Sequence, residues 1–144
     1  MKIQRLLFCL IFAFVCLATG CSNEIENEEQ IIMVQKRVGD ENKYEDFKEV
    51  TDNEQVMSIK ELLDDTDWEN AKVNMVRPPD YKFHFEHTDK GIKSNAVQHS
   101  VWISPNKDKL EVVIEGQSKY VQLTKEDSAI LFKVITGEKL TDLK

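Results

Sequence analysis

A run of short, strand-like segments separated only by brief turns leaves few folds open to this chain. The segment from Tyr81 to His87 alternates aromatic and polar side chains, which is typical of a half-buried strand. The turns are too short for the crossovers that join parallel strands, so neighbouring strands are expected to be antiparallel. The predicted strands are Tyr81–His87, Val97–Ser104, Leu110–Glu115 and Tyr120–Leu123, with turns at Thr88–Gly91, Pro105–Asp108 and Gly116–Gln117.

A helix is predicted before this run of strands. Thr51 with Glu54, and Asp52 with Gln55, form two overlapping capping boxes, which mark a helix start. The helix is expected to end near Asp64. Apolar residues recur behind the boxes at helical spacing, at Val56, Ile59, Leu62 and Leu63.

A second helix is predicted after the strands, from the N-cap Thr124 to Gly137. Its expected apolar stripe consists of Ile130, Leu131, Val134 and Ile135. Ser128 falls in its first turn and is given no role.

Three further strands are expected ahead of this run, and they complete the predicted fold. They are Ile31–Val38, Tyr44–Val50 after a turn at Gly39–Asn42, and Trp68–Val76, which Pro78 and Pro79 would end. We therefore predict an α+β fold, an antiparallel β-meander sheet with two helices packed on one face.

The N-terminus has the build of a secretory signal peptide. Lys2 and Arg5 precede an apolar run from Leu6 to Leu17, which is too short to span a bilayer. The patch "LATGC" that follows resembles the lipobox of bacterial lipoproteins, although Ala18 stands where a bulky aliphatic residue is usual. The resemblance implies that Cys21 is lipidated and that cleavage occurs before it. Secretion with a free Cys21 and a buried N-terminal helix are the alternatives.

The segment Ser22–Gln30 holds four glutamates and no basic residue, so it is expected to be a tether and not part of a core. The domain organisation predicted is a signal peptide over 1–20, a lipidated cysteine and acidic tether over 21–30, and one α+β extracytoplasmic domain over 31–144. Removing residues 1–20 takes away two basic residues and no acids, which changes the formal charge from −7 to −9. Such an acidic chain lacks the basic footprint that nucleic-acid binding needs. No cysteine other than Cys21 follows residue 20, which excludes a disulfide and a cysteine metal site.

The sequence "HFEH" raises the question of a metal site. On a strand His84 and Glu86 share one face while His87 points to the other, so this stretch offers at most two ligands. A tight hairpin with Asp89–Lys90 as its loop would place His99 opposite Asp80, away from His84. We therefore expect no metal and no cofactor.

Candidate catalytic groups are equally sparse. No Gly-x-Ser-x-Gly elbow surrounds Ser100, Ser104 or Ser128. The acids lie in runs typical of a solvated surface, such as Glu61, Asp64, Asp65 and Asp67. We predict that the protein is not an enzyme.

Three large aromatic residues, Trp102, Tyr81 and Trp68, are the candidate interaction surface. Trp102 shares its strand face with Ser100 and would be open to a partner if the helices cover the Val101 face. The alternative is that Trp102 is packed under the segment 64–76.

Three stretches, "PPDYKFHF" (Pro78–Phe85), "SVWISPNKDKLEVVIEG" (Ser100–Gly116) and "YVQLTKEDSAILFKVITGE" (Tyr120–Glu138), resemble the YhfM-like lipoproteins of Bacillus-type bacteria. The resemblance implies a small extracytoplasmic domain held at the cell membrane and implies no activity. The expected function is a non-catalytic binding or interaction module of the cell envelope, with an envelope protein as a possible partner. A sensor or regulator of a neighbouring membrane protein, and an envelope hydrolase or metal-dependent enzyme, are the alternatives.

Overall fold

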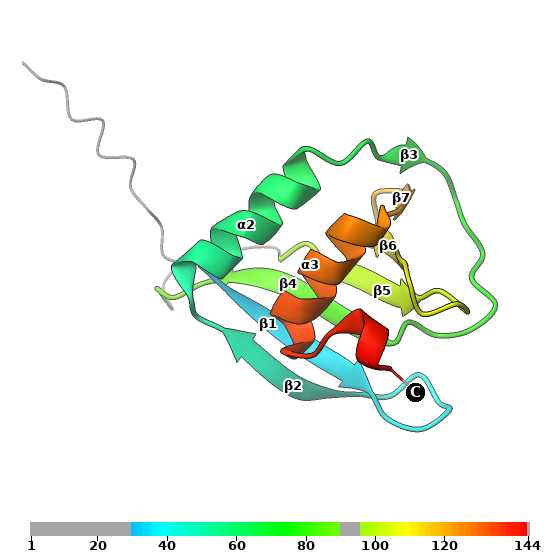
Figure 1. Cartoon of the computed structure of the whole chain (residues 1–144), viewed down its shortest axis with the longest axis horizontal. Coiled ribbons are helices and arrows are strands. Elements are labelled where there is room, and N and C mark those ends of the chain that lie inside the picture. The colour runs from blue at the N-terminus through cyan, green and yellow to red at the C-terminus, as the bar shows by residue number, and fades with distance from the viewer. Residues whose placement is uncertain (1–29, 90–95, 144) are drawn as a thin grey trace, which may run out of the picture.

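The computed structural model describes residues 30–89 and 96–143, and within them the chain forms one sheet with helices on one face (Figure 1). All six strand pairings are antiparallel, and the strand order is β2-β1-β4-β5-β6-β7-β3. The elements are β1 Gln30–Arg37, β2 Tyr44–Val50, α2 Asn53–Asp64, β3 Glu69–Asn70, β4 Tyr81–His87, β5 His99–Ile103, β6 Leu110–Ile114, β7 Lys119–Gln122, α3 Lys125–Thr136 and the 3₁₀ turn η1 Leu140–Asp142.

This architecture confirms the predicted α+β class. Strands β4 to β7 are consecutive neighbours and form the meander, while β1 and β2 extend it on the β4 side. Between β2 and β4 the chain passes through α2 to the opposite edge of the sheet, adds β3 there, and returns to β4 in the middle (Figure 1). In the described part of the chain, no helix has the length and apolar character needed to cross a membrane.

Both predicted helices begin where their capping residues place them. Asp52 caps α2 by accepting a hydrogen bond from the backbone N–H of Gln55 at 2.9 Å. Thr124 caps α3 in the same way, through the N–H of Asp127 at 3.1 Å. Gly137 ends α3 with a φ of 84°, a left-handed conformation that a residue without a side chain adopts without strain.

The predicted strand over Trp68–Val76 is wrong in most of its length. Only Glu69 and Asn70 pair, with Tyr120 and Lys119 of β7. Strand β7 has four residues and follows directly on a turn at Ser118. Only a short segment can therefore pair with it at the edge of the sheet. The chain then leaves the sheet, after Ala71 donates a last hydrogen bond to the carbonyl of Ser118 at 3.0 Å.

The register expected from a tight β4–β5 hairpin is also wrong. His99 lies opposite Phe83, not opposite Asp80, and Tyr81 lies opposite Val101. The shift is by an odd number of residues, which transfers a side chain to the other face of the sheet. His99 therefore shares the helix-covered face with Phe83.

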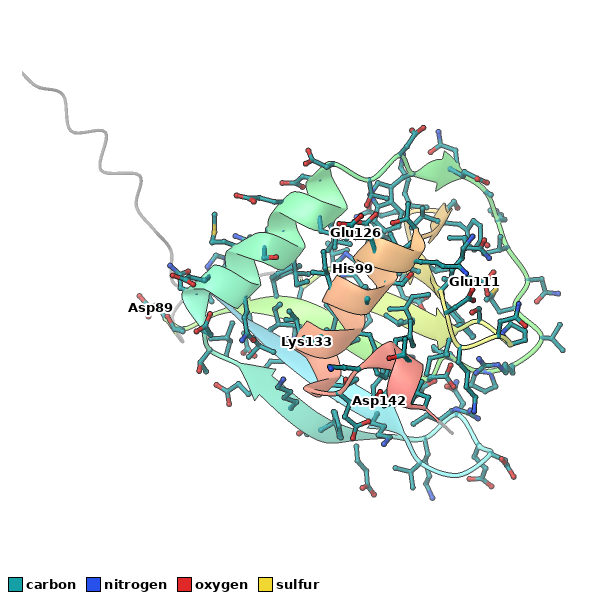
Figure 2. The ribbon with its side chains drawn as sticks, viewed as in Figure 1. Asp89, His99, Glu111, Glu126, Lys133 and Asp142 are labelled. Carbon is teal, nitrogen blue, oxygen red and sulfur yellow. The ribbon has the colours of Figure 1, made fainter. Side chains whose placement is uncertain are left out.

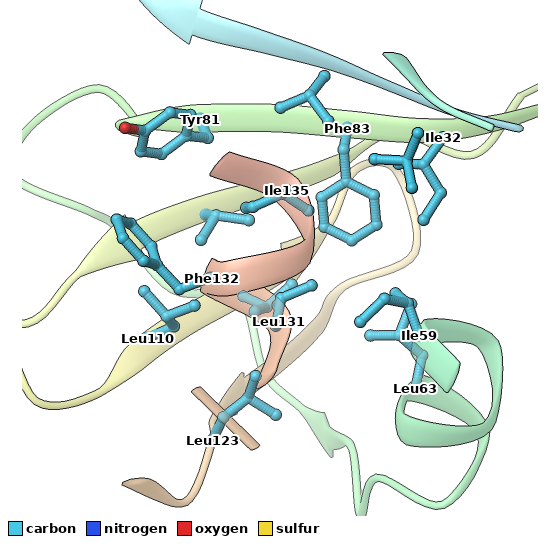
Figure 3. Packing of buried hydrophobic residues seen from close by; sticks show 14 of the residues in the cluster. Ile32, Ile59, Leu63, Tyr81, Phe83, Leu110, Leu123, Leu131, Phe132 and Ile135 are labelled. Atoms are coloured by element: carbon cyan, nitrogen blue, oxygen red, sulfur yellow. The ribbon is translucent and has the colours of Figure 1, made fainter. Parts of the chain in front are cut away.

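Helix α3 buries a stripe that is rotated from the predicted one (Figure 3). Leu131 and Ile135 are fully buried as expected, but Ile130 is 40% exposed and Phe132 takes its place in the core. Ser128 is buried as well, and its hydroxyl accepts a hydrogen bond from the backbone N–H of Leu110 at 2.9 Å. This bond fixes the start of α3 on the start of β6.

Candidate functional site

The three aromatic residues selected from the sequence do not form one exposed surface. Trp102 lies on the face away from the helices but is only 6% exposed, because the chain around Val76 and Arg77 packs over it. Its indole N–H donates to the carbonyl of Arg77 at 2.8 Å. The alternative arrangement, with Trp102 packed under the segment before β4, is therefore the one observed.

The other two aromatic residues lie on the helix side. Tyr81 is 4% exposed and meets Phe132 of α3 edge-on, with ring centroids 6.0 Å apart. Trp68 is partly buried beyond the end of α2, and its indole N–H donates to the carbonyl of Leu63 at 2.9 Å. Of the three, Trp68 alone borders the hollow described next.

A hollow of about 380 Å³ lies between α2 and the end of the sheet at which β1 begins. The register places its floor on three neighbouring strands: Phe85 of β4, His99 of β5 and Ile114, which pairs with His99, on β6. The second half of α2 and the segment after it form the opposite wall. The described residues that line the hollow are Gln30, Lys60, Leu63, Asp64, Trp68, Phe85, Val97, His99 and Ile114.

His99 is the least ordinary residue of this site, since it is a polar residue that is only 6% exposed on the helix-covered face (Figure 2). Its ring stacks on Phe83 with centroids 4.7 Å apart and an interplanar angle of 9°, and it meets Phe85 edge-on. Its Nδ1 is buried without a hydrogen-bond partner among the described residues. Burial lowers the pKa of His99 to about 4, although backbone groups of Val97 and Phe83 oppose the shift. The imidazole is therefore neutral at neutral pH.

The charged groups of the hollow lie at its rim. The ammonium of Lys60 is 5.9 Å from the centre of the Phe85 ring, within the range of a cation–π contact. It forms no salt bridge with any carboxylate in the described part of the chain. Asp64 is exposed one helical turn further along α2. At the other side of the rim the Gln30 amide lies 3.1 Å from Nε2 of His87.

The histidines do not converge. His84 lies on the sheet face opposite His99, and its Nε2 is 4.0 Å from a carboxylate oxygen of Glu86. Among residues 30–89 and 96–143, no three histidine, cysteine, aspartate or glutamate side chains are grouped to hold a metal ion. The described lining of the hollow also contains no serine, threonine or cysteine that a neighbouring base could activate.

A second hollow, of about 520 Å³, lies at the opposite end of the sheet, beside Trp102, Val76 and Pro105. Its basic group is already engaged: Arg77 donates to Asp80 at 2.6 Å and to the carbonyl of Ile103 at 2.8 Å. The smaller hollow is the better candidate site because it combines an aromatic floor with an ammonium group that has no carboxylate partner.

Sequence analysis did not select Lys60, Phe85 or Ile114 as site residues. They come from three elements that are distant in the chain: the β4–β5–β6 register places Phe85 near Ile114, and the packing of α2 on the sheet adds Lys60. With the observed register, the alternation of side chains along β4 and β5 would have grouped Phe85 with His99. Cys21 and the acidic segment 22–29 lie outside the described residues.

The comparison with known protein families matches residues 25–141 to the family described as YhfM protein. The chain belongs to the YhfM family. No curated protein and no solved structure matches it. The match covers the whole described domain up to Thr141, including every residue that lines the hollow beside α2.

Proposed function

We propose that this YhfM family member is a lipid-anchored, extracytoplasmic binding module of the cell envelope, without catalytic activity. It is held at the cell membrane through Cys21, and the hollow beside α2 is its binding site. The observation that carries the proposal is the position of this hollow: Gln30, which lines it, is the first residue of β1 and directly follows the acidic segment.

The proposed location at the membrane rests on the order of features at the N-terminus. Lys2 and Arg5, a short apolar run and the small-residue patch ending at Cys21 together have the pattern of a lipoprotein signal peptide. The nine residues from Ser22 to Gln30 reach at most roughly 30 Å when extended. A domain tethered in this way keeps the hollow within reach of molecules at the bilayer surface.

The binding role rests on the chemistry of the hollow. Small-molecule sites are mostly apolar cavities with a few polar groups that fix orientation, and volumes of about 300 Å³ or more are usual. The cavity of about 380 Å³, with Phe85 and Ile114 in its floor and Lys60 at its rim, meets that description.

Cell fractionation tests whether the protein is anchored to the membrane through Cys21. The Cys21→Ala variant should leave the membrane fraction or remain as an uncleaved precursor, because position 21 then has no thiol to accept a lipid. Cys16→Ala is the matched control, since it removes a thiol from the apolar run and should leave anchoring intact. Blocking the lipoprotein signal peptidase should likewise accumulate the longer form of the wild-type protein. A mature-sized Cys21→Ala band in the membrane fraction would refute the lipid anchor.

A further inference from the structure

The interior of the hollow beside α2 carries no formal charge. Its floor and wall are Phe85, Ile114, Leu63 and Trp68, and His99 beside them is neutral at neutral pH. Moving a charged group into such surroundings without a partner is strongly unfavourable. The part of a ligand that enters the hollow must therefore be apolar.

The charged residue at the rim indicates the sign of the charge on the ligand's head group. Lys60 is partly buried, and its ammonium lies over the Phe85 ring without a carboxylate partner among the described residues. An anionic group at the mouth would pair with this ammonium in a charge-assisted hydrogen bond. A cationic head would instead meet Lys60 as a like charge.

The neighbouring acid limits the charge of that head group. Asp64 is four residues after Lys60 on α2, so both side chains reach the same side of the mouth. Lys60 is the only cationic side chain in the described lining, so a second negative charge on the ligand would have no cation to pair with and would face Asp64. A monocarboxylate therefore fits the rim better than a phosphate monoester.

We infer that the hollow binds a long-chain monocarboxylate, with its apolar chain between α2 and the floor strands and its carboxylate at Lys60. This inference rests on the proposed function, because a bilayer next to the domain is where such amphiphiles are found. The Gln30 amide also lines the hollow and is a second polar group that a carboxylate could meet.

Trp68 provides a built-in reporter for this binding. It lines the hollow, whereas Trp102, the only other tryptophan, lies on the opposite face of the sheet. Residues 22–144 can be used without the leader, because the core of the domain is formed within residues 30–143. In the Trp102→Phe background, dodecanoate below its micellar concentration should change Trp68 emission saturably. In Trp68→Phe the emission of Trp102 should not respond.

Two substitutions on α2 should then shift the affinity in opposite directions. Lys60→Gln removes the ammonium and should weaken dodecanoate binding about tenfold, as expected for a charge-assisted hydrogen bond. Asp64→Asn removes the repelling carboxylate and should strengthen binding about two- to fivefold. Both residues are partly or fully exposed, so neither substitution should unfold the domain. Val97→Phe, at a rim position that is 41% exposed, should obstruct the mouth and abolish the response of Trp68 without adding a second tryptophan.

Three results would overturn the inference: no response of Trp68 to dodecanoate, equal affinity in wild type and Lys60→Gln, or tighter binding of dodecyltrimethylammonium than of dodecanoate. None of them bears on the Cys21→Ala fractionation. A mature-sized Cys21→Ala band retained in the membrane fraction, with dodecanoate binding intact, would refute the lipid anchor alone.

Discussion

Each end of the sheet borders a hollow, but the two ends differ in how their polar groups are bonded. At the tether end, where β1 begins at Gln30, the layer between α2 and the sheet holds a hollow, and Nδ1 of His99 has no hydrogen-bond partner among the described residues. At the distal end, where β1 finishes at Arg37, polar groups of several segments are bonded to one another. The contrast separates a region whose polar groups are bonded to one another from one whose polar groups are left for a ligand.

Asp80 organises the distal end. Its carboxylate accepts hydrogen bonds from the backbone N–H of Ile103 at 2.8 Å, from Arg77 at 2.6 Å and from Arg37 at 3.3 Å. Backbone bonds add to these, from Arg37 N–H to the carbonyl of Asp80 and from Asp80 N–H to the carbonyl of Val101. These contacts hold the chain that returns from β3 firmly against β1 and β5.

Helix α3 packs on the distal half of the sheet. Phe132 packs edge-on against Tyr81, which begins β4 at the distal end (Figure 3). The Ser128 hydroxyl accepts a hydrogen bond from the backbone N–H of Leu110, which begins β6 there. Leu131, Phe132 and Ile135 have no exposed surface. At the tether end Leu63 borders empty space on one side, so its side chain has fewer neighbours to lose.

Truncating one leucine in each half of the molecule gives the largest expected difference in the free energy of unfolding. Leu131→Ala should lower the free energy of unfolding by about 2–5 kcal/mol, because it opens a cavity in close-packed surroundings. Leu63→Ala should cost about 1–2 kcal/mol, at or below the low end of that range, because the site is already adjacent to a hollow. Urea melts of the two variants measure the difference.

Two further substitutions on α3 are controls for the leucine comparison. Ile130→Ala makes a comparable truncation at a position that is 40% exposed, and Lys133→Ala changes an exposed residue on the outer side of the helix (Figure 2). Both should shift the urea midpoint little. If Leu131→Ala melts at the same midpoint as Lys133→Ala, α3 is not docked on the sheet.

The neutral state of His99 makes the tether end sensitive to acid. The unfolded chain binds a proton at His99 below a pKa of about 6.5, while the folded chain does so only below about 4. The unfolded state thus holds more protons between these values, and stability falls as the pH is lowered through them. The loss amounts to about 3 kcal/mol by pH 4 and is absent above pH 7.

His99→Phe isolates this contribution, since phenylalanine keeps the stack on Phe83 and cannot be protonated. The difference in unfolding free energy between wild type and His99→Phe should therefore change by about 3 kcal/mol from pH 7 to pH 4. Urea melts at several pH values give this difference, in which other titrating groups largely cancel. A pH-independent difference would show that the imidazole is not buried as a neutral group.

Features set by local sequence were predictable. The caps Asp52 and Thr124, the left-handed Gly137 and the alternation along β4 depend on nearby residues, and the structure confirms all of them. The rotation of α3 was not predictable in this way. Five of its residues from Ile130 to Ile135 are apolar, more than one face can bury, and the position of the sheet decides which of them is left outside.

The hollow beside α2 was not predicted from the sequence, because it depends on contacts between residues that are distant in the chain. Its floor requires the β4–β5 register, which follows from the length of the connection between His87 and His99 and not from a local turn signal. The same limitation explains the error over Trp68–Val76: its alternation fits a strand, but β7 is too short to pair with it. Trp102 is buried because that segment crosses its face.

The smallest expected effect is a difference in stability between variants of the two tryptophans, one in each half of the molecule. Each indole N–H donates to a backbone carbonyl, Trp102 to Arg77 at 2.8 Å and Trp68 to Leu63 at 2.9 Å. Replacement by phenylalanine removes either bond but leaves the carbonyl in different surroundings. At the 6% exposed Trp102, water reaches the freed carbonyl poorly, so Trp102→Phe should cost about 1 kcal/mol. Trp68 is more exposed than Trp102, so water reaches the freed carbonyl of Leu63 more readily, and Trp68→Phe should cost less than about 0.5 kcal/mol. Urea melts followed by far-UV circular dichroism avoid dependence on tryptophan emission. Equal costs would mean that water reaches the Leu63 carbonyl no more readily than the Arg77 carbonyl, which would contradict a water-accessible site beside Trp68.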